Sequence, residues 1–444
     1  MRKLFVLLLF VSLTAACGGG GNGGITGNVG GGDCSVGSQK LTLLQAMRDW
    51  YLWNANLPAD VDVNQFVSPE ELLAFLTTFS PSDGMGNPVD RFSFIDSAAA
   101  DQQFFGEGRY EGYGFVRVAV APGDTRLARV FADSPAGRAG FERGQRILEL
   151  NGRTIAEIEA AEGVNAVLAT SPVNFLMRRP DDSEFSVSMG RDIVTIDPVP
   201  QFRVIDDGMN PPVGYMELVT FITPAEPEFE TAFAAFSAAG VNDVIIDVRW
   251  NGGGLLSTTE LLADYLGGLV AQNLVFTNTE FNADRAAANN DTSFFNLRGN
   301  SINLSRMVVV TNRGSASASE LIANGLEPHV DVTLVGDSTF GKPVGQVGLQ
   351  YCDRILRPAS FRLTNADGFG DYFDGLPADC AVTPDYSIPI GADNDPHIVA
   401  ATTLLNTGAC PVVAAPPGMN KFDAPDRGKP EDRSRPEREF LNAD

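Results

Sequence analysis

One lysine gives the first indication of chemistry in this sequence. The chain has five lysines among its 32 basic residues, and Lys342 is the only one between residues 41 and 420. Arginine keeps its proton at physiological pH, whereas a buried lysine can lose its proton and act as a base. That role requires burial to lower the lysine pKa from about 10.4 to about 7–8. Chance survival of one lysine in an arginine-rich chain is the alternative explanation.

Serines precede this lysine in the small-residue segment 314–320 (GSASASE), and Ser317 stands 25 residues before Lys342. An apolar run at 307–311 predicts a strand that leads into the segment, and a helix is expected to leave it. A hydroxyl at a helix N-terminus lies near free N–H groups, which favour a nucleophile and a developing oxyanion. The turn 251–254 (NGGG) follows another predicted strand and could offer a facing N–H.

Histidine and metal chemistry are poorly supported by the sequence. The chain has only two histidines, His329 and His397, and each is expected to be a surface or capping residue. An HExxH zinc site is therefore absent from the sequence, and no cysteine or histidine spacing indicates a metal. We expect neither a metal nor another cofactor, and a hydrolase here needs a base other than histidine.

The elements expected to position these residues alternate between strand and helix over residues 196–410. The predicted strands are 214–221, 244–248, 307–311 and 332–336, and the predicted helices are 226–239, 255–266 and 317–326. This alternation predicts an α/β layer architecture.

Residues 107–195 change to short strands and turns. Gly112-Tyr113-Gly114-Phe115 is followed at 134–152 by SPAGRAGFERGQRILELNG, and together they resemble a PDZ domain over its whole length. The resemblance implies that Gly112, Tyr113, Gly114 and Phe115 bind a peptide C-terminus: the glycines let N–H groups converge on its carboxylate, and the next strand edge accepts the peptide. Phe115 is expected to line the pocket for the terminal side chain. The alternative is a tight strand entry in a domain that acts as a lid.

The N-terminal third contains a targeting segment and a predicted helical domain. Arg2 and Lys3 precede the apolar run 4–13 and the sequence LTAAC, so residues 1–17 resemble a lipoprotein signal peptide with Cys17 as the acylated cysteine. An ordinary cleaved signal peptide is the alternative. Residues 18–37 are a glycine-rich tether, and residues 38–105 are a helical domain whose second helix begins with a capping box at Ser68.

Composition limits the partners. The net charge of −24 argues against nucleic acid. The tail 411–444 is rich in proline and charge and is expected to be disordered. In an oxidising compartment the remaining cysteines allow two disulfides with three connectivities, and Cys352–Cys380 is the preferred pair. The four are Cys34, Cys352, Cys380 and Cys410.

Three segments resemble those of the C-terminal processing (tail-specific) serine peptidases: 247–254 (DVRWNGGG), 315–320 (SASASE) and 339–346 (TFGKPVGQ). The resemblance implies that Ser317 is the nucleophile, rather than Ser315 or Ser319, and that Lys342 is the general base. Ser315 is then expected to cap the helix.

The same resemblance assigns supporting roles. Gln346 would orient the lysine, and the N–H groups of Ala318 and Gly253 would form the oxyanion hole. Segment 90–95 (DRFSFI) resembles the lipoprotein branch of this family more loosely, and Pro343 and Gly252 are departures from its pattern.

The sequence thus predicts a multidomain α+β protein with an N-terminal helical segment, a PDZ domain and a crotonase-like (ClpP-like) α/β serine peptidase domain. We expect a bacterial, extracytoplasmic enzyme, lipid-anchored at the outer membrane or cell surface, that cleaves unfolded or C-terminally recognised polypeptides with a Ser–Lys dyad. The alternatives are an inactive PDZ-bearing lipoprotein that binds polypeptide C-termini and a crotonase-type acyl-CoA enzyme. A secretion signal argues against the acyl-CoA enzyme because it makes CoA inaccessible. Nothing in the sequence predicts the oligomeric state.

Overall fold

The computed structural model describes residues 26–28 and 33–411. The predicted signal peptide, Cys17, most of the glycine-rich tether and tail residues 412–444 lie outside the described residues. Within the described ranges, no helix has both the length and the apolar character needed to cross a bilayer.

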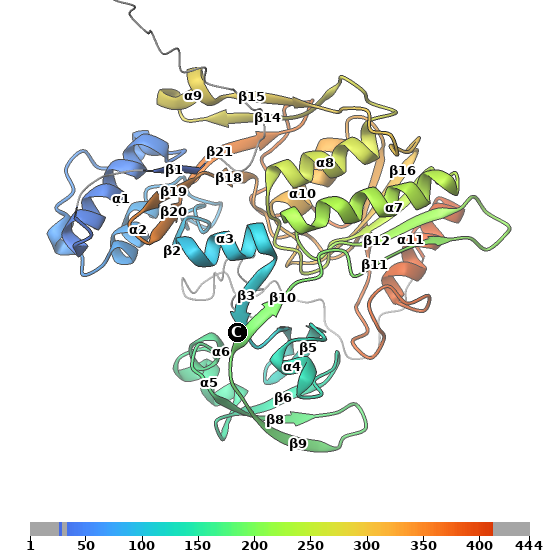
Figure 1. The fold of residues 1–444 in the computed structure, drawn as a ribbon, viewed down its shortest axis with the longest axis horizontal. Coiled ribbons are helices and arrows are strands. Elements are labelled where there is room, and N and C mark those ends of the chain that lie inside the picture. Colours follow the sequence, from blue (N-terminus) through green and yellow to red (C-terminus); the bar gives the residue numbers. More distant parts are fainter. Residues whose placement is uncertain (1–25, 29–32, 412–444) are drawn as a thin grey trace, which may run out of the picture.

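A six-stranded sheet, called the central sheet here, has the strand order β11-β12-β13-β16-β17-β22. Its strands β11, β12 and β16 lie on the right in Figure 1. Its strands are β11 (Gln201–Ile205), β12 (Val213–Glu217), β13 (Asp243–Asp247), β16 (Arg306–Thr311), β17 (Asp331–Gly336) and β22 (Cys380–Ala381). The strands from β12 to β22 are parallel, and β11 pairs with β12 in the antiparallel sense. Continuous runs of valine and isoleucine form β13 and β16 because both faces of a parallel sheet are covered.

Alternate side chains of these strands pack on opposite faces. Val244, Ile246 and Val309 pack in the larger core with helices α7 (Glu226–Ala238), α8 (Leu256–Gly267) and α10 (Ala318–Leu326). Ile245 and Val308 pack on the other face with α11 (Pro396–Thr407). The strands and helices predicted for this region are therefore confirmed, although β12 ends four residues before the predicted boundary.

Two smaller sheets extend the molecule beyond the central sheet. One has the order β15-β14-β21-β18 and the other β1-β19-β20-β2. Their strands are β14 (Val275–Phe281), β15 (Asp291–Phe294), β18 (Val344–Gln346), β21 (Ala359–Thr364), β1 (Thr26–Asn28), β2 (Phe94–Ser97), β19 (Gly348–Tyr351) and β20 (Arg354–Arg357), with helix α9 (Ala283–Asn289) between β14 and β15. The first of these sheets carries β18, which begins two residues after Lys342.

The N-terminal helices share their buried core with the rest of the fold. The elements are α1 (Val36–Trp50), α2 (Pro69–Thr77), α3 (Ala98–Glu107) and the short 3₁₀ turns Asn54–Asn56 and Val63–Gln65; a third such turn, Thr223–Ala225, precedes α7. Met47 and Tyr51 belong to the same buried cluster as Leu356 and Phe361. Strand β2 also pairs with β20, so this region is built into the rest of the fold.

The start of α2 follows the predicted pattern only in part. Ser68 accepts a hydrogen bond from the Glu71 N–H, and Pro69 is the first helical residue. The Glu71 carboxylate accepts from the Val67 N–H instead of completing a capping box with the N–H of Ser68.

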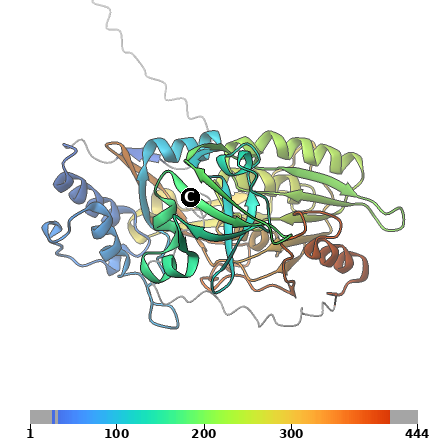
Figure 2. The same cartoon turned by 90° about the horizontal axis from the view of Figure 1, so that it is seen from below.

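Residues 109–195 form a unit that β3 (Arg109–Gly112) and β10 (Asp192–Thr195) connect to the rest as an antiparallel pair. Its sheet runs β4-β5-β6-β8-β9, and most of its buried side chains form a cluster of their own, while Val116 and Ala128 pack with Ile222 and Trp250 outside the unit. The elements are β4 (Phe115–Ala121), β5 (Asp124–Val130), α4 (Pro135–Arg138), β6 (Arg146–Leu150), β7 (Arg153–Thr154), α5 (Ile155–Ala161), α6 (Val164–Leu168), β8 (Val173–Arg178) and β9 (Glu184–Met189). Seen from below, this unit lies in front of the molecule, between the N-terminal helices and α11 (Figure 2).

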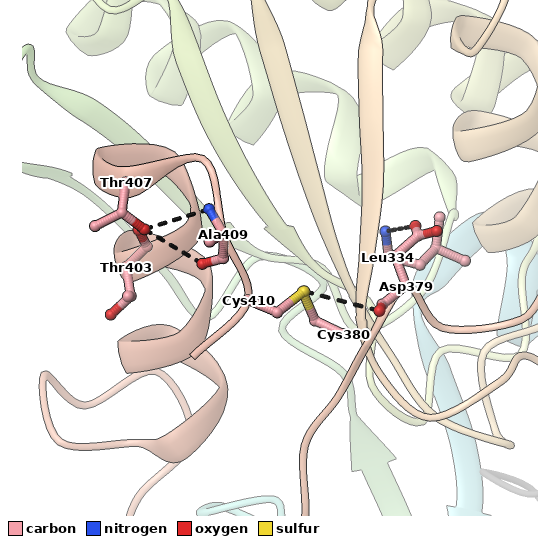
Figure 3. The surroundings of a disulfide bond; sticks show 7 residues. All are labelled: Leu334, Asp379, Cys380, Thr403, Thr407, Ala409 and Cys410. Carbon is pink, nitrogen blue, oxygen red and sulfur yellow. Dashed lines mark hydrogen bonds between the residues drawn. A yellow bond between two sulfur atoms is a disulfide. The ribbon is translucent and has the colours of Figure 1, made fainter. Parts of the chain in front are cut away.

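The predicted Cys352–Cys380 disulfide is wrong. Cys34 is bonded to Cys352, and Cys380 is bonded to Cys410 (Figure 3). Cys352 lies in the turn between β19 and β20, next to the N-terminal helices, whereas Cys380 is on β22 at the edge of the central sheet. The two cysteines are close in sequence but belong to different sheets, so each pairs with a cysteine from another part of the chain.

Candidate active site

Ser317 lies at the turn between β16 and α10, at the N-cap position of the helix. Its backbone has φ of 54° and ψ of −112°, a conformation that non-glycine residues rarely adopt. Such local strain persists only where the surroundings enforce it, and it clusters at functional sites. The side chain is half-buried, so Ser317 is partly accessible.

Ser315 does not cap α10, so that expectation is wrong. Its hydroxyl donates to the Val248 carbonyl at 2.8 Å and accepts from the Asn312 N–H at 3.0 Å. Because Val248 directly follows β13, Ser315 fixes the serine turn to the end of the neighbouring strand.

The glycine turn 251–254 packs directly against Ser317. A Cβ atom at Gly253 would lie 2.8 Å from the Ser317 Cβ and 3.0 Å from the Ala318 nitrogen, and the φ of Gly253 is +111°. The Asn251 carbonyl accepts hydrogen bonds from the Ala316 N–H and the Ser319 hydroxyl. Glycine is therefore required at 253 by close approach as well as by backbone conformation.

The two expected oxyanion donors differ in their present hydrogen bonding. The Ala318 N–H is at the first position of α10, where an N–H has no partner within its own helix. The Gly253 N–H instead donates to the Asn251 Oδ1 at 2.9 Å. Gly253 is thus correctly placed beside the serine, but its N–H must leave Asn251 before it can bind an oxyanion.

Lys342 is buried, with 2% of its surface exposed, and its Nζ donates to the Gln346 Oε1 at 2.7 Å. The Gln346 Nε2 donates to the carbonyls of Phe92 at 2.7 Å and Arg357 at 2.8 Å. Two carbonyl acceptors fix the amide nitrogen on one side, so the amide oxygen must face the lysine. The structure therefore places Gln346 where it can orient Lys342.

A buried carboxylate, Glu320, connects the serine turn to the lysine segment. Its Oε2 accepts from the backbone N–H groups of Ser317 and Lys342, each at 2.8 Å. Its Oε1 accepts from the Gly341 N–H at 2.7 Å and the Thr339 hydroxyl at 2.5 Å. Burial raises the pKa of Glu320, although these four hydrogen bonds oppose the shift. Sequence reasoning missed this role, even though Glu320 closes the SASASE segment.

A second buried charge cluster holds the start of the glycine turn. The Arg249 guanidinium binds Asp247 and Asp395, each at 2.6 Å, and contacts the His397 Nδ1 at 3.0 Å. The expectation that His397 is a surface or capping residue is wrong: Asp395 caps α11, and packing of α11 on the sheet leaves His397 2% exposed against Arg249. His329 is half-buried, and its Nε2 lies 2.8 Å from the Val275 carbonyl.

Burial and the neighbouring charges shift the pKa values of both Asp395 and His397. Burial raises the pKa of Asp395, but the hydrogen bond from His397, the Arg249 charge and the Arg249 hydrogen bonds outweigh burial and hold that pKa below its ordinary value. Burial and the Arg249 charge lower the pKa of His397, against an opposing effect of Asp395 and Asp247. The imidazole is therefore kept neutral beside the arginine.

The four expected peptide-binding residues lie at the junction of β3 and β4. Tyr113 and Phe115 are fully buried in the core of the 109–195 unit, and the Tyr113 hydroxyl donates to the Thr170 carbonyl at 2.6 Å. Gly114 has φ of +86°, and a Cβ there would collide with Ser134. Strand β4 is at the edge of its sheet, but Phe115 is a core residue in this structure.

The part of the chain that the structure describes contains no group of three or more His, Cys, Asp and Glu side chains placed to hold a metal ion.

Two family models match the chain. Residues 212–386 match Peptidase family S41, and residues 38–94 match the Peptidase S41 N-terminal domain. The first range contains Ser317, Lys342, Gln346 and Glu320, and the second contains α2 and most of α1.

The chain is similar in sequence to proteins described as carboxy-terminal processing proteases. The chain is 28% identical over 248 residues to "Carboxyl-terminal-processing peptidase 3, chloroplastic" of Arabidopsis thaliana, covering 53% of this chain and 46% of that protein. It is 26% identical over 273 residues to a carboxy-terminal-processing protease of Bartonella bacilliformis, covering 58% of this chain and 59% of that protein. The chain thus spans about half the length of the curated relatives it matches.

Among solved structures, the fold is similar to that of a Bacteroides fragilis protein assigned as an S41 protease. The TM-score is 0.64 at 24% identity, covering 83% of this chain and 97% of that one. This similarity concerns the fold: a mixed α/β arrangement with an N-terminal helical region.

The neutral His397 predicts a pH dependence of stability. The unfolded chain takes up a proton near the ordinary histidine pKa of 6.5, while His397 in the folded state stays neutral to lower pH. The free energy of unfolding therefore falls as pH drops below about 6.5. Urea unfolding measures how far the free energy of unfolding falls between pH 7.5 and pH 5.5. In His397→Asn this fall should be smaller than in wild type by about 1 kcal/mol. His329→Asn is the matched control, and equal pH dependence in wild type and His397→Asn would contradict the prediction.

Proposed function

Since residues 38–94 and 212–386 belong to peptidase family S41, we propose that this chain is a serine endopeptidase with Ser317 as nucleophile and Lys342 as general base. The observation that carries the proposal is the Glu320 carboxylate, whose Oε2 binds the backbone N–H groups of both residues. The two backbone nitrogens therefore lie close together. The burial of Lys342 supports its role as a base because desolvation disfavours the charged amine.

In the proposed reaction, neutral Lys342 takes the proton of the Ser317 hydroxyl as the Oγ attacks the scissile carbonyl carbon. The Ala318 N–H stabilises the oxyanion, and the Gly253 N–H joins it after leaving Asn251. The lysine ammonium then gives its proton to the leaving amine as the peptide bond breaks. Lys342 next takes a proton from a water molecule, whose oxygen attacks the ester carbonyl of the acyl-enzyme. The bond from that carbon to the Ser317 Oγ breaks, the acid product leaves, and the lysine ammonium returns the proton to Oγ. Gln346 keeps Nζ oriented throughout.

The alternative of an inactive lipoprotein that only binds polypeptide ends is less well supported. The serine, the lysine and the glutamine are all present, and Glu320 connects the segments that carry the first two. An acyl-CoA function has no support from the family matches.

The dyad predicts the outcome of three substitutions. Ser317→Ala removes the nucleophile and Lys342→Ala removes the base, so each should reduce cleavage by roughly a thousand-fold or more. Lys342→Arg should cause a similar loss, because arginine cannot give up its proton at pH 7. Wild-type activity should rise toward alkaline pH as the lysine deprotonates. The assay is digestion of an unfolded protein, with mass spectrometry of the products.

Lys40→Arg is the matched control for this experiment. Lys40 is also buried, but its Nζ donates to the Phe66 carbonyl at 2.7 Å, away from the site. The activity of Lys40→Arg should match that of wild type. Near-normal turnover by Lys342→Arg would overturn the dyad.

We also propose that residues 107–195 are a PDZ domain that recruits substrates by their C-termini through Gly112, Tyr113, Gly114 and Phe115. The glycine loop and the edge position of β4 support this proposal, since an edge strand can accept an added peptide strand. The burial of Phe115 implies that the terminal side chain can contact its ring only if the neighbouring side chains move.

Recognition of a free C-terminus predicts a difference between otherwise identical substrates. One unfolded substrate is prepared in three versions: with its natural free C-terminus, with an amidated C-terminus, and with Asp-Asp as its last two residues. The two altered substrates should be cleaved several-fold more slowly, mainly through a higher KM, because charge-assisted hydrogen bonds worth roughly 1.5–3 kcal/mol are lost. Equal rates would leave the unit as a scaffold or lid.

The proposed location is the outer membrane or surface of a bacterial cell, with the protein anchored by lipid on Cys17. Support comes from the sequence alone, since Cys17 lies outside the described residues. Two or more acyl chains give stable anchoring. Cys17→Ser should move the protein from the detergent phase to the aqueous phase on phase partition, and retention in the detergent phase would contradict the anchor.

A further inference from the structure

Segment 90–93 (Asp90, Arg91, Phe92 and Ser93) of the N-terminal region reaches the proposed general base. It is more than 240 residues away from Lys342 and Gln346 in sequence, yet it forms hydrogen bonds with Gln346 and with the residue before Lys342. The sequence indicated only a loose family likeness for this segment, and the mechanism above assigns it no part.

Arg91 attaches this segment to the loop that carries the lysine. Its Nη2 donates to the carbonyls of Phe340 at 2.9 Å, Gly341 at 3.1 Å and Phe373 at 3.0 Å. The guanidinium also lies over the Phe340 ring, with its Cζ 4.6 Å from the ring centroid. Arg91 thus binds the two residues that immediately precede Lys342.

Phe92 makes two separate contacts with the proposed catalytic groups. Its carbonyl accepts from the Gln346 Nε2 at 2.7 Å, which turns the Gln346 Oε1 toward Lys342. Its ring lies beneath the lysine, with Nζ 5.9 Å from the centroid, and the Arg91 Cζ lies 5.1 Å from the same centroid. Phe92 is 1% exposed and packs on the rings of Phe340 and Phe373.

Asp90 and Ser93 fix the backbone of this segment. The Asp90 Oδ1 accepts from the N–H groups of Phe92 and Ser93, each at 3.0 Å, and its Oδ2 accepts from the Ser93 hydroxyl at 2.6 Å. The Ser93 Oγ in turn accepts from the Ala359 N–H at 2.9 Å. The direction of the Phe92 carbonyl is therefore set by a buried turn that is itself anchored to β21.

We propose that Arg91 and Phe92 are positioning residues for the general base: Arg91 fixes the backbone before Lys342, and Phe92 orients Gln346 and covers the Lys342 amine. The inference rests on the proposed function, because it concerns how the lysine of that reaction is placed. It assigns the N-terminal region a direct part in catalysis as well as its structural one.

The charges around Lys342 determine how its titration responds to a change at Arg91. The charged groups of the packed segments include the Arg91 guanidinium, the Glu320 carboxylate bound to the Lys342 N–H, the Asp90 carboxylate of the buried turn, and Asp374, which follows Phe373. Removing the Arg91 charge takes a cation away from the lysine. Proton loss from Lys342 then requires a higher pH.

The test is steady-state cleavage of a fluorescently labelled unfolded protein by the full chain between pH 6 and 10. Arg91→Met should lower kcat about ten-fold or more while KM stays within about two-fold, since misplacement of a catalytic group costs rate rather than binding. The pH of half-maximal kcat should move up by about half a unit. Arg91→Lys keeps a cation with three donor hydrogens for the same carbonyls and should retain more of the wild-type kcat than Arg91→Met does.

Arg285→Met is the matched control. Arg285 also joins the N-terminal region to the rest of the chain: it donates to the Asp49 carbonyl at 3.2 Å and lies over Trp50, 4.2 Å from the ring centroid. It contacts neither Lys342 nor Gln346 by any of these interactions. Its kcat and pH profile should equal those of wild type.

A kcat for Arg91→Met within two-fold of wild type overturns the proposal, and so does an equal loss in Arg285→Met. If Arg91→Met does not fold, Phe92→Leu is tested instead, because it keeps the backbone carbonyl but removes the ring. An unchanged kcat and pH profile in Phe92→Leu then overturns the proposal. Inactive wild type, or active Ser317→Ala, would instead contradict the proposed function. An active wild type with inactive Ser317→Ala and a normal Arg91→Met contradicts the positioning role alone.

Discussion

The site depends on one buried carboxylate. Glu320 comes from the first turn of α10 and accepts hydrogen bonds from the Ser317 turn and from the segment that carries Lys342. These two segments follow different strands of the central sheet and have no covalent reason to stay close. A buried acceptor with four donors is costly to leave half-satisfied, because an unpaired buried polar group loses its hydration without compensation. The two segments are therefore maintained as a unit: displacing either one leaves Glu320 with unfilled acceptor positions.

The remaining contacts extend this arrangement outward in two directions. On the side of the glycine turn, Arg249 is neutralised by Asp247 and Asp395, so the end of β13 is joined to α11. On the side of the lysine, Gln346 and the loop before Lys342 are bound by the segment that contains Arg91 and Phe92. The N-terminal helices share their core with the strands near the lysine, so this contact is part of a continuous packed interior. The geometry of the site is thus determined by segments from both ends of the described chain.

The features that the sequence predicts are those encoded over a few consecutive residues. Apolar runs identified β13 and β16, and the small residues after them identified the turns that contain Ser317 and Gly253. The missed features depend on contacts between distant segments. The pairing of Cys34 with Cys352 follows from the position of β19 beside the N-terminal helices. The burial of His397 follows from how α11 packs on the sheet. The hydrogen bond from the Gly253 N–H to Asn251 depends on the conformation of one turn, which residue types alone do not specify.

The disulfide between Cys34 and Cys352 closes a covalent ring across a sequence separation of 318 residues. Both proposed catalytic residues, the whole 109–195 unit and most of the central sheet lie inside this ring. A single backbone cut anywhere within it leaves one molecule, because the two fragments remain joined through sulfur for as long as the bond is oxidised. At the proposed location outside the cytoplasm, a nick in a surface loop would therefore leave the protein in one covalent piece. Only reduction of the bond or a second cut would release a fragment from within the ring.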